Sequence, residues 1–296
     1  MSFLENIDKN KLQKIVLIVI SALTLAAITL LLTIIVLSIR PQSPTVDQEI
    51  EFKTVAVENK DVNTGTLILA DDDHPYTPNE QWLDLVDCKN YRNQTLGLTK
   101  EEADSKDPAL YAKKKYLPYG GMMLNSVAME QAHKMLIDTI ASVEDDNVSG
   151  SITIDGAYAI QYNVSPDLDE FKTGLLLFLS DSTSDSGVHV KLPDAYATWL
   201  KANAAKYGFV ESFKDAYRYV GVTHATYMAE KELTLADYIN YLKKNHSADK
   251  KMLEVGDYGV YYVSCKAGDS INVPANNEYT VSGTNEGGVI VTVKLK

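Results

Sequence analysis

An uninterrupted apolar run near the N-terminus is the feature that most restricts how this chain can fold. Residues 15–39, IVLIVISALTLAAITLLLTIIVLSI, contain no charged side chain. As an α-helix they would be about 37 Å long, enough to cross a hydrocarbon core of about 30 Å with some tilt. A cleaved secretory signal is the alternative, but its apolar region is usually only about 7–15 residues long. Since no small-residue cleavage site follows the run, it predicts one uncleaved transmembrane helix.

The charges around this run predict its orientation. Lys9, Lys11 and Lys14 precede it and only Arg40 follows it closely. The positive-inside rule therefore places residues 1–14 in the cytoplasm and the C-terminal part outside the cell membrane. The chain has a net charge of −12, which is carried by the part after the apolar run. An exterior part this acidic argues against nucleic acid or anionic lipid as a partner.

The two cysteines leave two interpretations open. Cys88 and Cys265 lie far apart in the sequence. Outside a cell they could form one disulfide, or both could be buried thiols. Their spacing fits neither a small disulfide framework nor a Cys-x-x-Cys metal motif.

The rest of the chain divides into a linker, a larger α+β domain and a small β extension. Residues 40–64 mix Pro, Ser and charged side chains, which predicts a stalk. Residues 65–250 combine short strand-like runs with helical patterns, of which residues 125–143 are the longest, with apolar side chains three and four apart. Residues 251–296 are rich in Val, Tyr and Thr between turn residues, which predicts strands alone.

Three motifs in a fixed order carry a family resemblance. They are LILADDDHPYTP (67–78), WLKANAAKYGF (199–209) and YRYVG (217–221), the last followed by His224-Ala225. The second is similar to the W-L-x-x-N-A-x-x-Y-G-F segment of the VanY-type D-alanyl-D-alanine carboxypeptidases, and the third to their R-Y-V-G…H-A segment. These are zinc peptidases that trim peptidoglycan stem peptides. The resemblance covers about residues 65–245 and implies a hedgehog/DD-peptidase-like antiparallel sheet with packed helices.

The positions that carry the chemistry of this family are occupied by other residues here. The first zinc motif, S-x-H-x-x-G-x-A-x-D, aligned on Gly187, has its histidine at Ser184 and its aspartate at Lys191. The second motif, E-P-W-H, has its general base at Phe213 and its third ligand at Ala216. A substrate-binding arginine of the family falls on Tyr158.

These replacements remove the donors that a catalytic zinc ion requires. Such an ion takes three protein ligands and activates a water in the fourth position. A hydroxyl, a methyl, a phenyl and an ammonium group supply neither that ligand set nor a base. Zinc is the cofactor that the family implies, but we expect no cofactor, no metal ligand and no catalytic residue here.

One alternative is a metal site assembled from other side chains. His189 shares a strand face with Lys191, so we expect it near the same cleft, and Asp181, Asp185 and Asp215 are the nearby candidate ligands. The simpler interpretation of His189 is a half-buried side chain in a polar groove. Tyr158, Ser184, His189, Lys191, Phe213 and Ala216 are called the vestigial cleft positions below.

The remaining candidates have structural interpretations. His74 lies in an acidic turn, and His246 in a run of charged residues. His133 and His224 lie in helical patterns, where a packing role is expected. Ser184 has no G-x-S-x-G elbow that would mark it as a nucleophile.

Three functions remain compatible with the sequence. The first is a membrane-anchored, catalytically inactive carboxypeptidase-like module that binds a peptidoglycan stem peptide or a cell-wall enzyme. The second is an active peptidoglycan metallocarboxypeptidase with an unconventional site. The third is a structural ectodomain of an envelope complex.

Overall fold

The computed structural model describes residues 17–20, 23–24, 50–143, 151–158, 160–161, 169–181 and 191–296. It divides into two units, Met1–Glu49 and Ile50–Lys296. Most of the predicted membrane-spanning run, residues 15–39, lies outside the described residues, and its described pieces are helical. Within the described part of the chain, no helix is both long enough and apolar enough to cross a bilayer.

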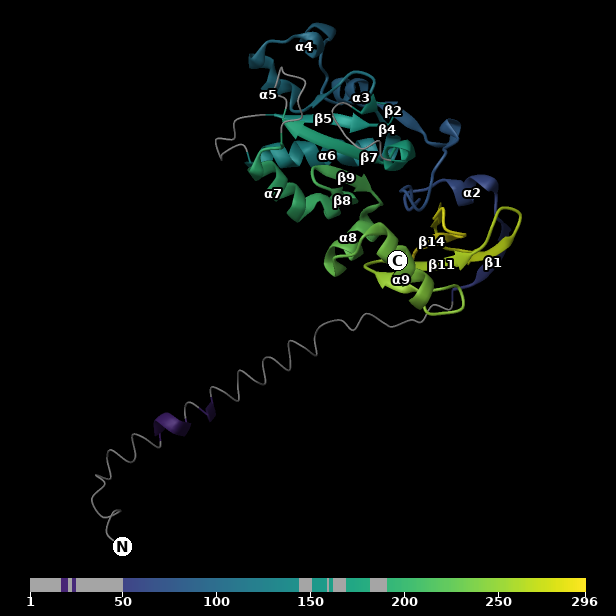
Figure 1. Ribbon diagram of the computed structural model, residues 1–296. Helices are drawn as coiled ribbons and strands as arrows, with labels where there is room; N and C mark the ends of the chain where they lie inside the picture. The colour runs from purple at the N-terminus through teal and green to yellow at the C-terminus, as the bar shows by residue number, and fades with distance from the viewer. Residues whose placement is uncertain are drawn as a thin grey trace, which may run out of the picture. The chain divides into compact units, whose positions relative to one another are not determined.

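The larger sheet of the second unit has the order β3-β5-β7-β9-β8, with β6 paired to β5. Figure 1 labels its strands β5, β7, β9 and β8. The pair β3–β5 is parallel and the other pairs are antiparallel. The strands are β3 (Leu117–Pro118), β5 (Ile152–Ala157), β6 (Ile160–Gln161), β7 (Leu176–Asp181), β8 (Phe209–Phe213) and β9 (Ala216–Tyr219). A separate pair joins β2 (Leu85–Asp87) to β4 (Met123–Asn125).

The helices account for most of the remaining described chain. The α-helices are α2 (Asn59–Asn63), α3 (Cys88–Thr95), α4 (Lys100–Asp104), α5 (Tyr111–Lys114), α6 (Ser126–Val143), α7 (Asp194–Asn203), α8 (Val222–Lys231) and α9 (Leu235–Asn245). Short 3-10 helices are η1 (Glu80–Trp82), η2 (Pro108–Leu110), η4 (Asp169–Thr173) and η5 (Ala204–Tyr207). The helix predicted over 125–143 is observed as α6.

Helices α6 and α7 cover one face of the larger sheet. Met135 and Leu136 of α6 are fully buried against Leu177 and Leu179 of β7 in one apolar core. Because successive side chains of a strand point to opposite faces, Leu176 and Phe178, which alternate with Leu177 and Leu179 on β7, belong to the other face. The fold is therefore the predicted mixed α+β arrangement of antiparallel sheets and packed helices, and α6 and α7 cover one face of the larger sheet.

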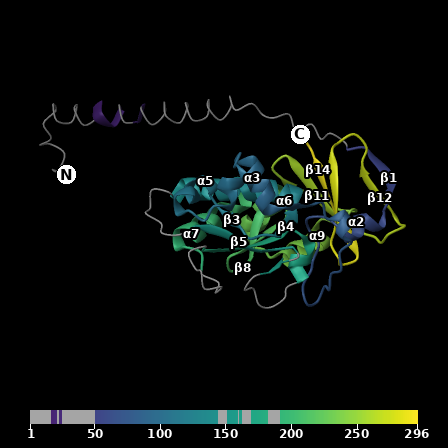
Figure 2. The ribbon, with the colours of Figure 1, turned by 90° about the horizontal axis from the view of Figure 1, so that it is seen from above.

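The last strands form a second sheet with the order β10-β11-β14-β13. Its strands are β10 (Leu253–Val255), β11 (Tyr258–Ser264), β13 (Tyr279–Gly283) and β14 (Gly288–Lys294), while β12 (Ser270–Pro274) pairs with β1 (Phe52–Ala56). Figure 2 shows these strands gathered at one end of the unit. In Figure 1, α8 lies between the larger sheet and these strands.

The segment 50–64, predicted as the end of a stalk, has regular structure instead. Strand β1 pairs in antiparallel register with β12 over five residues, and helix α2 follows it. Val57 is buried in the apolar cluster that holds Ile271 and Val273. The sequence signal for β1 is weak, because the alternation in TVAV (54–57) is short and charged residues surround it. The partner strand, β12, lies more than two hundred residues further along the chain.

Arg218 of β9 ties the start of the domain to the larger sheet. Its guanidinium is buried and donates to the carbonyl oxygens of Ile68 at 3.0 Å and Thr66 at 3.3 Å. It also donates to Thr173 Oγ1 at 3.1 Å and lies 3.6 Å from Glu170 Oε1. The arginine of the YRYVG motif is thus a structural residue.

His224 joins α8 to both α9 and the C-terminal sheet. Its Nδ1 lies 2.9 Å from Tyr238 Oη, and its Nε2 lies 3.0 Å from Thr292 Oγ1 of β14. The ring is buried, and burial lowers its pKa from 6.5 to about 4. The packing role expected for this histidine is confirmed.

This buried ring predicts a pH dependence of stability. Because the folded-state pKa of His224 is below its unfolded value, the unfolded state binds more protons between about pH 4 and pH 6.5, so stability falls as pH is lowered through that range. The loss attributable to His224 is at most about 3 kcal/mol. We expect His224→Gln to flatten the free energy of unfolding of the detergent-solubilised chain over this range. Equal slopes for the parent and the variant would contradict this role.

Candidate functional site

The candidate site lies on the face of the larger sheet that α6 and α7 leave uncovered. On β7, Leu176 and Phe178 alternate with the residues of the helix-covered core. On β9, Ala216 alternates with Tyr217 in the same way. We call this side of the sheet the cleft face.

An apolar cluster fills the centre of the cleft face. Phe178 and Phe213 stack with ring centroids 6.0 Å apart and an interplanar angle of 25°. Ala216 is fully buried, and Phe171 of η4 and Leu176 complete the group. We call these five residues the aromatic cluster. The two positions at which the resemblance puts a general base and a zinc ligand, Phe213 and Ala216, are therefore packed together inside it.

The hairpin between β8 and β9 brings these two positions together. Phe213 is paired with Ala216 across the turn, and a register shift follows Glu211. Asp215 takes a left-handed conformation in the turn, with φ of 63°, and is buried. Its backbone carbonyl accepts a hydrogen bond from the Leu179 amide at 2.8 Å, which fastens the hairpin to β7.

Lys191 lies at the rim of this region with a partner of its own. Its exposed ammonium donates to Asp194 in the first turn of α7. Asp194 raises the pKa of Lys191, and Asp215 adds a smaller effect in the same direction. Lys191 is therefore fully cationic at neutral pH, and Asp194 compensates its charge locally.

Tyr158 is bonded to a carboxylate. Its hydroxyl donates to Glu80 Oε1 at 2.7 Å, and its amide donates to the Met123 carbonyl at 3.0 Å. Burial, followed by the hydrogen bond to Glu80, raises the pKa of Tyr158 to about 12. Where the family places an arginine that binds substrate, this chain has a neutral phenol beside an acidic side chain.

Two vestigial cleft positions, Ser184 and His189, lie outside the described residues, as does Asp185. Asp181, another ligand candidate, accepts a hydrogen bond from the Ser151 amide at 3.1 Å. Within the described residues, no three His, Cys, Asp or Glu side chains are grouped so that they could hold a metal ion. At the two positions where the resemblance puts a general base and a zinc ligand, the structure has a phenyl ring and a methyl group, and neither group fits zinc.

The structure adds a polar row that the sequence patterns did not single out. Thr153 and Asp155 of β5 and Ser180 of β7 are buried, and Thr153 is paired directly with Ser180. Thr153 Oγ1 has no hydrogen-bond partner in the described structure. The alternation of Ile with polar residues in SITID is the signal that could have placed this row on the cleft face.

The other residues weighed as candidates have structural surroundings. Cys88 and Cys265 are both buried free thiols, which decides between the two interpretations of the cysteines. His133 Nδ1 lies 2.8 Å from Tyr116 Oη, and His74 Nδ1 lies 2.7 Å from Asp71 Oδ1. His246 Nδ1 lies 2.8 Å from the Lys251 carbonyl.

The filled cleft face predicts that a histidine cannot be introduced at Ala216 without a loss of stability. Ala216→His would place an imidazole in fully occupied space, and overpacking of this kind costs about 1–3 kcal/mol. Urea unfolding of the detergent-solubilised variant should show this loss. Ala112→His, at an exposed position of α5, is the matched control and should be nearly neutral. An unchanged stability of Ala216→His would show that the cleft face has room for the ring.

Comparisons with known proteins place this geometry in a family context. A D-alanyl-D-alanine carboxypeptidase of Enterococcus faecium is 30% identical over 150 residues, which is 45% of this chain and 46% of the relative, so the match spans less than half of that protein. No protein-family model matches the chain.

Solved structures support the fold. The vancomycin-resistance D,D-dipeptidase VanXYg, in complex with a D-Ala-D-Ala phosphinate analogue, aligns over 82% of this chain and 99% of its own, with a TM-score of 0.60 and 19% identity. The D,D-pentapeptidase VanY in complex with Zn(II) aligns over 41% of this chain and 86% of its own, with 16% identity and a TM-score of 0.31, too low to support an argument. The resemblance of this chain to the VanY-type D-alanyl-D-alanine carboxypeptidases is thus confirmed, by sequence over part of its length and by the fold of a VanXY-type dipeptidase over most of it.

Proposed function

We propose that this protein is a D-alanyl-D-alanine carboxypeptidase-like module without peptidase activity, anchored in the cell membrane by residues 15–39 and exposed outside the cell. Its function would be to bind a peptidoglycan stem peptide or to act as a scaffold in the cell wall. The observation that carries this proposal is the aromatic cluster, in which Phe213 stacks on Phe178 and Ala216 is fully buried.

The chemistry of peptide hydrolysis explains why this cluster matters. A zinc peptidase needs a metal to polarise the scissile carbonyl and a base to take a proton from the attacking water. A phenyl ring accepts no proton, and a methyl group binds no metal. Phe213 and Ala216 therefore remove both functions at neighbouring positions of one hairpin.

The anchoring part of the proposal rests on the sequence. The apolar run has the length of a bilayer-spanning helix, and lysines precede it. The binding part rests on the likeness to proteins whose names specify D-alanyl-D-alanine as the group that they act on or bind.

Metal content and turnover test the loss of activity. We expect the full chain, purified in detergent micelles, to hold no stoichiometric zinc by elemental analysis after dialysis against Zn²⁺. We also expect it to release no D-alanine from a synthetic stem pentapeptide. The reason is the missing ligand and base at Ala216 and Phe213.

The alternative of an active enzyme with an unconventional site makes the opposite prediction. Stoichiometric zinc together with D-alanine release that a chelator abolishes would overturn the proposal. If His189→Ala then lost the zinc while a second histidine variant, His246→Ala, kept it, the metal site would be a relocated one near the cleft.

Binding without turnover is tested separately. If Lys191 attracts the terminal carboxylate of a stem peptide, Lys191→Ala should weaken binding of the pentapeptide only a few-fold, because Asp194 already compensates the exposed ammonium and such pairs contribute about 0.2–1 kcal/mol. Calorimetric titration measures this, with Lys206→Ala as the control at an exposed position of η5. Equal affinities for the parent and Lys191→Ala would remove Lys191 from the binding site.

A further inference from the structure

A groove runs along the free edge of the larger sheet. It has a volume of about 440 Å³, within the usual range of ligand sites, and includes residues of β8, of the end of α7 and η5, and of the α8–α9 connection. We call it the β8 groove. The four vestigial cleft positions that the structure describes, Tyr158, Lys191, Phe213 and Ala216, do not line it.

Among the residues that the structure describes, β8 is the last strand on its side of the sheet. In an antiparallel pair, residues alternate between those bonded to the partner strand and those whose N–H and C=O point away from it. The Val220 amide donates to the Gly208 carbonyl at 2.8 Å, so Gly208 and every second residue after it are bonded to β9. Glu211, three residues along, therefore directs its backbone N–H and C=O toward the open edge.

The two sides of the β8 groove differ in character. Val210 faces the side formed by Met228 and Leu233, where it packs in an apolar cluster. Glu211 lies opposite Tyr217 and so faces the side of α7. A strand added along this edge would place alternate side chains on these two sides.

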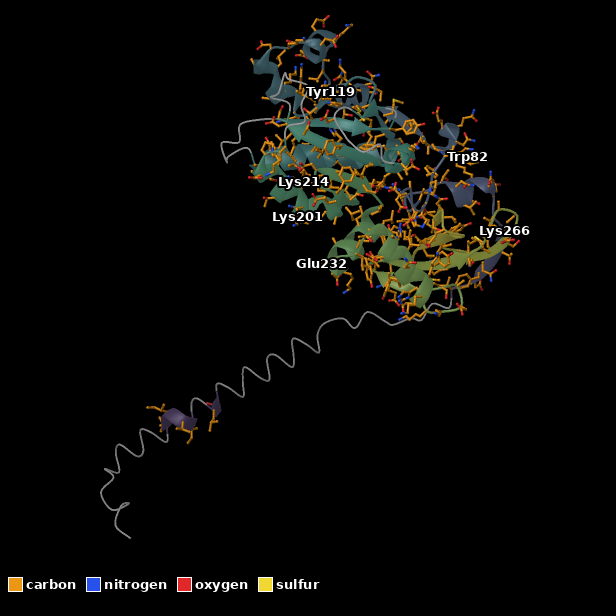
Figure 3. All side chains as sticks on the ribbon, viewed as in Figure 1. Trp82, Tyr119, Lys201, Lys214, Glu232 and Lys266 are labelled. Atoms are coloured by element: carbon orange, nitrogen blue, oxygen red, sulfur yellow. The ribbon has the colours of Figure 1, made fainter. Side chains whose placement is uncertain are left out.

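The charges of the β8 groove favour a cationic partner. Glu211 and Glu232 are exposed in its lining, and Lys201 is the one exposed cation among the described residues that line it. Lys201 belongs to α7 and Glu232 directly follows α8, and both line the groove (Figure 3). Glu170 contributes little to the free charge, because it accepts a hydrogen bond from Ser212 at 2.7 Å and neutralises Arg218.

We propose that the β8 groove binds a short extended segment of another protein, in which apolar and basic residues alternate, as an additional strand paired with β8. Backbone hydrogen bonds of Glu211 would hold the segment, its apolar side chains would contact Val210 and Leu233, and its basic side chains would meet Glu211. The register shift beyond Glu211 keeps the paired stretch short. This proposal does not depend on the absence of peptidase activity.

The test uses the full chain in detergent micelles and a fluorescent peptide in which valine and lysine alternate. We expect binding by fluorescence anisotropy, and much weaker binding of a matched peptide in which valine and glutamate alternate. Glu211→Gln should weaken binding several-fold, and Glu211→Pro, which also removes the outward N–H, by about tenfold. Glu230→Gln, at an exposed position of α8 outside the groove, is the control and should bind like the parent.

A second version of the test avoids any change in the protein. Methylation of alternate backbone nitrogens of the valine–lysine peptide removes its hydrogen-bond donors on one edge, and one of the two possible methylation patterns should abolish binding. The proposal is overturned if the parent chain does not bind the peptide, if the glutamate peptide binds equally well, or if neither Glu211→Gln nor methylation affects binding. It is also overturned if sedimentation shows a dimer of the parent chain that Glu211→Pro dissociates, since the occupant would then be a second copy.

Discussion

The buried guanidinium of Arg218 is the interaction on which the arrangement of the larger domain depends. It satisfies the carbonyl oxygens of Thr66 and Ile68, which belong to a segment that forms no strand of its own. A buried charge without partners is strongly unfavourable, and so are buried carbonyl groups without donors. The arginine and the segment therefore stabilise each other. Because Glu170 and Thr173 of η4 complete the set, the entry of the chain, η4 and β9 form one mutually dependent group.

Residues that stabilise the fold lie on the same strands as the positions that the resemblance assigns to zinc chemistry, Phe213 on β8 and Ala216 on β9. On β9, Arg218 and Ala216 share the cleft face, so the strand that holds the domain together also carries the fully buried methyl group at the position that the resemblance assigns to a zinc ligand. Phe213 then packs on Phe178, and stacked aromatic pairs contribute about 0.5–1.5 kcal/mol beyond the burial of their area. Phe213 and Ala216 thus contribute to a packed cluster on the cleft face.

The sequence predicts local elements well, because they depend on the spacing of nearby residues. The assignment of Phe213 and Ala216 to the positions of a general base and a zinc ligand rests on the family resemblance alone. The helix predicted over 125–143 follows from apolar spacings of three and four residues and is observed as α6. The residues that fill the cleft face cannot be predicted in this way. Phe171 and Phe178 are distant from Phe213 in the sequence and come near it only when the sheet forms. The same limit hid the strand β1, whose partner β12 lies near the other end of the chain.

The pairing of β1 with β12 has a consequence for the design of recombinant fragments. A fragment that begins at residue 65, where the resemblance to carboxypeptidases begins, would lack β1, Val57 and α2. Strand β12 would then become an unpaired edge, and Ile271 and Val273, which are buried in the intact chain, would lose their cover. Since open edges with apolar side chains promote association between molecules, such a fragment would be prone to precipitate, whereas one that begins before residue 50 would retain a complete β module.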